Sequence, residues 1–226
     1  MRVERELFGA VTFTTSLHGL CRTLVLAVLL LSIASCSRQL ENTPIAAGAT
    51  VLALGDSITF GTGARPGEDF PAHLAVRSGW NVVNAGIPGD MARDARARLA
   101  PLLDQYQPVA VLVELGGNDF LRQRSEAAVK EDLRGILNTV KATGALPILV
   151  AVPRFSMLRA TVGALSDSTI YAELADEEGV PLISGALSAV LSDEALRADP
   201  IHPNAAGYAR LADEMADILT ASGLLL

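Results

Sequence analysis

A serine, a few histidines and an aspartate are the residues of this chain whose chemistry stands out first. Ser57 lies in the stretch VLALGDSITFG, Val51–Gly61, where an apolar run ends abruptly in a glycine, an acid and the serine. A serine hydroxyl becomes a nucleophile only when a base takes its proton. A serine at such a position also suits the capping of a helix, so the nucleophile hypothesis requires a partner elsewhere in the sequence.

The base must come from the histidines of the chain, which are His18, His73 and His202. His18 lies in an N-terminal segment that we expect to be removed, and His73 lies inside a predicted helix as a surface or core-edge residue. His202 follows Asp199 by three residues, and a carboxylate on one ring nitrogen leaves the other nitrogen free to accept a serine proton. The alternative is a loop histidine ahead of a helix that Asn204 caps.

Acyl transfer also needs donors for the oxyanion of the tetrahedral intermediate. Gly89 in NAGIPGD and Asn118 in GGND follow two further apolar runs. A glycine lets its backbone N–H approach a ligand closely, and an asparagine amide donates without carrying charge. Each residue alone is equally well explained as a turn glycine or a helix cap, but together with Ser57 they favour a site.

Short apolar runs and longer amphipathic stretches alternate along the chain and must position these residues. The runs predict strands at Thr50–Leu54, Asn81–Gly86, Val109–Leu115, Leu146–Val152 and Val180–Ser184, and the stretches predict helices near Phe70–Arg77, Ala92–Gln105, Ser125–Thr143, Leu165–Glu178 and Ala205–Ala221. This alternation predicts an α/β fold of three layers, with a parallel sheet covered on both faces. The carboxyl ends of the strands then gather Ser57, Gly89 and Asn118 at one edge.

In order and spacing, these blocks resemble the SGNH (GDSL) hydrolases, over about Val51–Leu219. The stretch QPVAVLVELGGNDFLR is especially similar to the branch of bacterial acyl-CoA thioesterase I, lysophospholipase and arylesterase. The resemblance implies a flavodoxin-like sheet of five parallel strands, no metal and no cofactor. It also implies Ser57 as nucleophile, His202 as base, Asp199 as its orienter, and Ser57, Gly89 and Asn118 as oxyanion donors. Pro200 departs from the glycine of many relatives, which puts the Asp199–His202 geometry in question.

The resulting interpretation is a serine esterase that hydrolyses acyl esters or thioesters through a covalent acyl-enzyme. Two alternatives stay open: a carbohydrate O-deacetylase of the same superfamily, and a non-catalytic envelope lipoprotein that keeps the fold as a binding module. The low aromatic content, 4 %, offers few rings for stacking sugars.

Apolar residues that follow the third and fourth strands are candidates for an acyl pocket: Phe120, Leu121, Pro153, Phe155, Met157 and Leu158. The alternative is that these residues only pack their loops against the body of the domain.

The N-terminal region differs from the rest of the chain. Arg22 precedes the apolar stretch TLVLAVLLLSIA, which is typical of a secretory signal and too short to span a bilayer. The tetrad IASC resembles a bacterial lipobox, which implies lipidation of Cys36; an ordinary cleaved signal with a chance cysteine is the alternative. We therefore expect a signal peptide over residues 1–35, a tether over 36–48, a hydrolase domain over 49–226, and a membrane-anchored lipoprotein on the periplasmic side of the cell envelope.

Charge and motif content weaken other function classes. The formal net charge is −7 and no basic cluster is present, which argues against nucleic-acid binding. The stretch GDSITFGTGA lacks the lysine of a phosphate-binding loop and does not match GxGxxG, so nucleotide binding has no support.

Overall fold

The computed structural model describes residues 43–154 and 165–226. Contacts divide the chain into Met1–Glu41 and Asn42–Leu226, and every element described below belongs to the second unit. The expected signal peptide, the lipobox with Cys36, and the pocket candidates Phe155, Met157 and Leu158 lie outside the described residues.

A parallel sheet of five strands forms the centre of the domain, in the order β2-β1-β3-β4-β5. The strands are β1 (Thr50–Gly55), β2 (Asn81–Gly86), β3 (Ala110–Glu114), β4 (Leu146–Val150) and β5 (Leu182–Ile183). The central strands β1 and β3 are buried on both faces, which explains why they consist almost wholly of Val, Leu and Ala. The α/β fold class with a five-stranded parallel sheet is confirmed.

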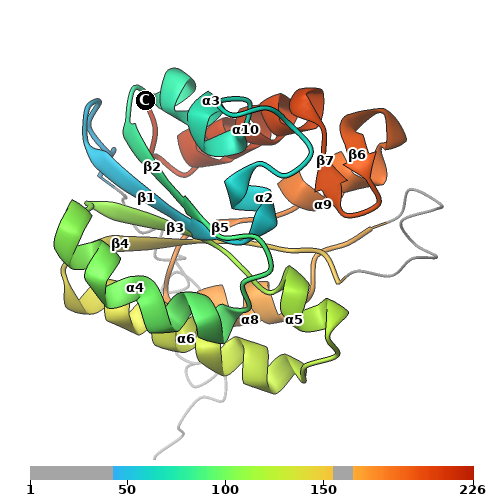
Figure 1. Ribbon diagram of the computed structural model, residues 1–226. Coiled ribbons are helices and arrows are strands. Elements are labelled where there is room, and N and C mark those ends of the chain that lie inside the picture. Colours follow the sequence, from blue (N-terminus) through green and yellow to red (C-terminus); the bar gives the residue numbers. More distant parts are fainter. Residues whose placement is uncertain (1–42, 155–164) are drawn as a thin grey trace, which may run out of the picture. The chain divides into compact units, whose positions relative to one another are not determined.

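Helices cover both faces of the sheet (Figure 1). One face carries α3 (Phe70–Ser78) and α10 (Ala205–Ala221), which pack on each other, and the other carries α4 (Ala92–Tyr106) and α6 (Glu126–Ala142), with α8 (Ile170–Glu178) beside α6. Shorter elements stand at the carboxyl edge of the sheet: α2 (Ser57–Phe60), α5 (Gly117–Leu121), α9 (Ala186–Ser192), η1 (Glu194–Leu196), β6 (Arg197–Asp199) and β7 (His202–Pro203). No helix within residues 43–154 and 165–226 combines the length and the apolar character that crossing a membrane requires.

Two predicted boundaries differ from the structure. The helix expected from Leu165 begins only at Ile170, because Asp167 pairs with Pro153 in an isolated bridge and its carboxylate accepts hydrogen bonds from Gly185 and Ser188. The last part of the expected tether packs on the domain, where Ile45 donates its N–H to Leu224 and accepts from the Trp80 indole.

Candidate active site

Ser57 stands at the first position of α2, directly beyond the carboxyl end of β1. Asp56 caps this helix, since its Oδ1 accepts from the Ile58 N–H at 3.0 Å. The helix ends after a single turn at Gly61, whose φ of 97° is left-handed. The chain therefore turns sharply at the end of a buried strand and presents the serine, with its N–H free of an intrahelical partner, at the edge of the sheet.

Ser57, His202 and Asp199 form a continuous chain of hydrogen bonds. His202 Nε2 lies 3.0 Å from Ser57 Oγ, and His202 Nδ1 lies 2.7 Å from Asp199 Oδ2. Asp199 Oδ1 also accepts from the backbone N–H groups of Ile201 and His202, at 2.9 and 3.0 Å. Pro200 therefore does not disrupt the turn, in which the Asp199 carboxylate and the His202 imidazole are in contact.

The environment of Asp199 favours its ionised form. Partial burial raises the pKa of the carboxyl, but the hydrogen bonds from His202 and from the Ile201 N–H outweigh this effect, and the pKa lies below its ordinary value. An ionised Asp199 accepts from an Nδ1–H, which leaves the lone pair of Nε2 directed at the serine hydroxyl.

Gly89 lies in the loop after β2, which approaches α2 closely. A Cβ on Gly86 would lie 2.3 Å from the Phe60 nitrogen, so only glycine lets the end of β2 lie this near α2. Gly89 itself has a φ of 89°, open space where a Cβ would stand, and an N–H without a hydrogen-bond partner among the described residues. Its N–H is therefore available to a ligand.

Asn118 lies in α5, beyond the carboxyl end of β3, and both of its amide hydrogens are engaged. Its Nδ2 donates to Asp56 Oδ2 at 3.0 Å and to the Asp90 carbonyl oxygen at 3.1 Å. The amide is thus held between the loop after β1 and the loop after β2, at the edge where Ser57 lies.

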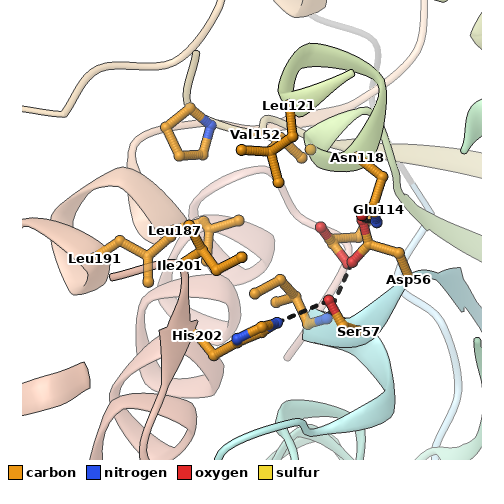
Figure 2. A pocket seen from close by; sticks show the side chains of 13 residues that line it. Asp56, Ser57, Glu114, Asn118, Leu121, Val152, Leu187, Leu191, Ile201 and His202 are labelled. Carbon is orange, nitrogen blue, oxygen red and sulfur yellow. Dashed lines mark hydrogen bonds between the residues drawn. The ribbon is translucent and has the colours of Figure 1, made fainter. Parts of the chain in front are cut away.

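An apolar cavity adjoins the serine (Figure 2). Its polar wall includes Ser57, Asn118 and His202, and its apolar wall consists of Ile58, Leu121, Val152, Pro153, Leu187, Leu191 and Ile201. Leu121 is 45 % exposed, so the apolar wall extends to the surface.

Only some of the expected acyl-pocket residues line the cavity in the structure. Leu121 and Pro153 line the cavity, whereas Phe120 does not, because its ring packs edge-on against Tyr171 with the centroids 6.5 Å apart. Sequence reasoning missed the contributions of Val152, Ile201 and α9. The spacing of Leu187 and Leu191, one helical turn apart, is the signal that could have identified α9.

Two buried carboxyl groups behind the serine were also missed. Asp56 is 2 % exposed and Glu114, at the end of β3, is 1 % exposed. Burial raises the pKa of Asp56 to about 6, against the hydrogen bonds from Ile58 and Asn118. Burial, followed by the charge of Asp56, raises the pKa of Glu114 well above its ordinary value, so Glu114 is the neutral member of the pair.

Metal ligation finds no support in the described part of the chain, where no three His, Cys, Asp or Glu side chains are grouped to hold an ion.

Comparison with known proteins gives consistent results. The model of the GDSL-like Lipase/Acylhydrolase family matches residues 53–210. The chain is 41 % identical over 177 residues to Thioesterase 1/protease 1/lysophospholipase L1 of Escherichia coli K12, covering 76 % of this chain and 83 % of that protein. It is 31 % identical to Esterase TesA of Pseudomonas aeruginosa, covering 82 % and 94 %. The crystal structure of the psychrotrophic esterase EstA from Pseudoalteromonas superposes with a TM-score of 0.66 at 25 % identity, covering 76 % of this chain and 97 % of that one.

Proposed function

Because this chain belongs to the GDSL-like lipase/acylhydrolase family and is a hydrolase of carboxylic esters, we propose that Ser57 is its nucleophile, His202 its general base and Asp199 the group that orients the base. The observation that carries this assignment is the chain of hydrogen bonds from Ser57 Oγ through both ring nitrogens of His202 to Asp199. A module that only binds a ligand has no need of this arrangement.

The reaction follows from these contacts. His202 Nε2 takes the Ser57 proton while Oγ attacks the carbonyl carbon of the ester or thioester, and the carbonyl oxygen becomes an oxyanion. His202 then gives the proton to the departing alkoxide or thiolate, which leaves an acyl-serine. Water, deprotonated by His202, attacks this acyl group; His202 then returns the proton to Ser57 Oγ as the bond to the serine breaks, and the carboxylic acid is released.

The oxyanion is assigned to three donors, the N–H of Ser57, the N–H of Gly89 and the amide of Asn118. The first is an orphan N–H at the start of a helix and the second has no partner in the described chain. The third must release its contact with the Asp90 carbonyl to receive the oxyanion. Removal of one such donor raises the barrier by about 3 kcal/mol.

A fluorophosphonate probe tests the nucleophile. Labelling of wild-type protein and loss of labelling and esterase activity in Ser57→Ala are the expected results. Ser78→Ala is a matched control, because its hydroxyl binds the Leu74 carbonyl within α3, away from the site. Full labelling and activity of the Ser57→Ala protein would show that the assignment is wrong.

The substrate class that we propose is esters and thioesters of medium-length acyl chains, with the acyl chain in the apolar cavity beside Ser57. The wall that supports this is formed by Leu121, Val152, Leu187, Leu191 and Ile201. Each buried methylene contributes about 0.8 kcal/mol, which corresponds to roughly a fourfold gain in kcat/KM per methylene until the cavity ends.

A series of p-nitrophenyl esters from acetate to octanoate tests this substrate class. In the wild type, kcat/KM should rise with chain length; in Leu187→Ala and Val152→Ala the rise should be flatter, while hydrolysis of acetate, which has no methylene to bury, is retained. A wild type that is fastest on acetate, with no loss on longer esters in either variant, would instead favour the deacetylase.

We also propose that the chain is exported and anchored by a lipid on Cys36. The support lies in the sequence: an apolar stretch after Arg22, ending in IASC.

A further inference from the structure

One carboxylate contacts both the nucleophile's helix and the amide assigned to the oxyanion. Asp56 Oδ1 caps α2 at Ile58, one residue beyond Ser57, and Asp56 Oδ2 accepts from Asn118 Nδ2. In Figure 2 the carboxylate of Asp56 lies between these two groups, behind the cavity. Two segments that are 62 residues apart in sequence are therefore fixed relative to each other by a single side chain.

We propose that Asp56 is a positioning residue for the hydrolysis: its carboxylate holds one hydrogen of the Asn118 amide, so that the other is directed to the place where the oxyanion forms. This inference rests on the proposed function, in which Asn118 is an oxyanion donor.

The chemistry of the two acceptors determines which hydrogen is released to the substrate. The contact with Asp56 Oδ2 is a hydrogen bond to a charged acceptor, whereas the contact with the Asp90 carbonyl is a bond between neutral groups. Bonds to ionised acceptors are roughly twice as strong. The oxyanion therefore displaces the Asp90 carbonyl, and Asp56 keeps the amide oriented throughout the reaction.

Asp56 must be ionised in this role, and its charged neighbours are arranged accordingly. Glu114 is neutral, and the negative charge of Asp119 is offset by the ion pair with Arg124. A protonated His202 would favour the charged form of Asp56, and a nearby cation, Arg98, donates to the Gly55 carbonyl and pairs with Asp90.

Two tyrosines complete this environment. The Tyr171 and Tyr208 hydroxyls donate to the carbonyls of Leu115 and Thr62. Burial raises the pKa of both above the ordinary value, so neither adds charge.

Substitutions of Asp56 separate its two contacts. Asp56→Ser keeps an N-cap oxygen for α2 but is too short to reach Asn118, and Asp56→Asn can satisfy only one of its two donors with its single oxygen. We expect kcat on p-nitrophenyl hexanoate to fall by about 10- to 1000-fold with little change in KM. The upper end of this range is the loss expected when one oxyanion donor is missing.

Asp69 offers a matched control. Its Oδ1 caps α3 at Ala72 and accepts from the amide of Asn84, at 3.0 and 3.2 Å, so Asp69 combines a helix cap with an amide contact, as Asp56 does, but contacts none of the proposed oxyanion donors. Asp69→Ser and Asp69→Asn should keep kcat within about twofold, since both residues can still cap α3 and neither change touches an oxyanion donor.

A double-mutant cycle with Asn118→Ala decides whether Asp56 acts through the amide. Asp56→Ser should lower kcat in the wild type and have no further effect in Asn118→Ala. An equal loss in both backgrounds would overturn the inference. Full activity of Asn118→Ala would instead refute the assignment of Asn118 as a donor, so the two failures are distinguishable.

The acid limb of the pH profile gives a second test that does not depend on Asp56 variants. Activity requires neutral His202 and ionised Asp56, whose pKa is about 6, so log(kcat/KM) should approach a slope of 2 below pH 6, at pH values where Asp199 with its lowered pKa is still ionised. In Asn118→Ala the ionisation of Asp56 no longer affects the rate, and the slope should be 1. A slope of 1 in both proteins would overturn the inference.

Discussion

At the scale of single residues, the same functional group serves different purposes because its surroundings differ. Asp199, half exposed and bonded to His202, is held in the ionised form. Glu114 has Thr59 Oγ1 as a donor at 2.8 Å on one oxygen, while its other oxygen is buried without a hydrogen-bond partner in the described part of the chain, and Glu114 is held neutral. Burial costs the charged form more than the neutral form, so a buried carboxyl such as Glu114 stays neutral unless hydrogen bonds to the charged form offset that cost, as they do in part at Asp56.

Glu114→Gln should therefore change how stability depends on pH. The pKa of Glu114 is 4.5 in the unfolded chain and is raised in the folded protein, so the folded protein binds this proton more tightly. The free energy of unfolding therefore falls as the pH rises from 4.5 through the raised pKa. The slope is at most about 1.4 kcal/mol per pH unit. Because glutamine has the shape of the neutral acid and does not ionise, Glu114→Gln should not lose stability in this way as the pH rises.

Urea denaturation from pH 4.5 upward measures the effect. Wild type should lose stability relative to Glu114→Gln as the pH rises; a constant difference between the two proteins would show that Glu114 is ionised when buried.

Residue types and spacing were sufficient to predict the residues that meet around Ser57, because Ser57 and Asn118 follow recognisable apolar strands and Asp199 and His202 lie three residues apart just before the last helix. The structure brings Ser57, His202 and Asp199 into hydrogen-bond contact as expected. The positions of Asp56 and Glu114 could not be predicted in this way. An acid at a strand end is usually solvated, and only the packing of β1 and β3 side by side buries both carboxyls.

At the scale of elements, the long helices and the strands were predictable and the short elements were not. Helices such as α10 have several apolar turns that define a period, whereas α2 has four residues and depends on its cap and on the contact with β2. Where a local pattern is this short, tertiary packing determines the structure.

Gly86→Ala should therefore reduce both stability and activity. Its Cβ would lie 2.3 Å from the Phe60 nitrogen and 2.8 Å from the Asp56 carbonyl oxygen, both backbone atoms, so α2 must move. We expect the free energy of unfolding to fall by about 1–3 kcal/mol, and kcat to fall because Ser57 moves with the helix. Chemical denaturation and esterase assays measure the two effects.

Gly144→Ala separates these two effects. Its φ of 83° strains an alanine, but no atom lies within 4 Å of the new Cβ. This control should lose about 1 kcal/mol of stability and keep the wild-type kcat. An unchanged kcat in Gly86→Ala would contradict the role of this close approach.

At the scale of the whole molecule, the proposed signal and lipidation segment precedes the body that holds the candidate active site. The body begins at Ile45, which is held by Leu224 and Trp80. The nine chain steps from Cys36 to Ile45 can span at most about 30 Å when fully extended. A lipid on Cys36 would thus keep Ile45, where the body begins, within that distance of the membrane surface.

Cys36→Ser should therefore release the enzyme from the membrane. Expressed as the full chain in a Gram-negative host, the wild type should sediment with membranes, carry acyl groups on Cys36 by mass spectrometry and resist extraction by salt. The variant should be soluble or unprocessed, and its soluble form should keep the wild-type kcat on p-nitrophenyl esters, because the catalytic contacts all lie beyond Ile45. Ser37→Ala, next to the cysteine, is the matched control and should remain in the membrane fraction. A fully soluble wild type without lipid would contradict the anchor, and its cleavage at another residue would identify an ordinary signal peptide.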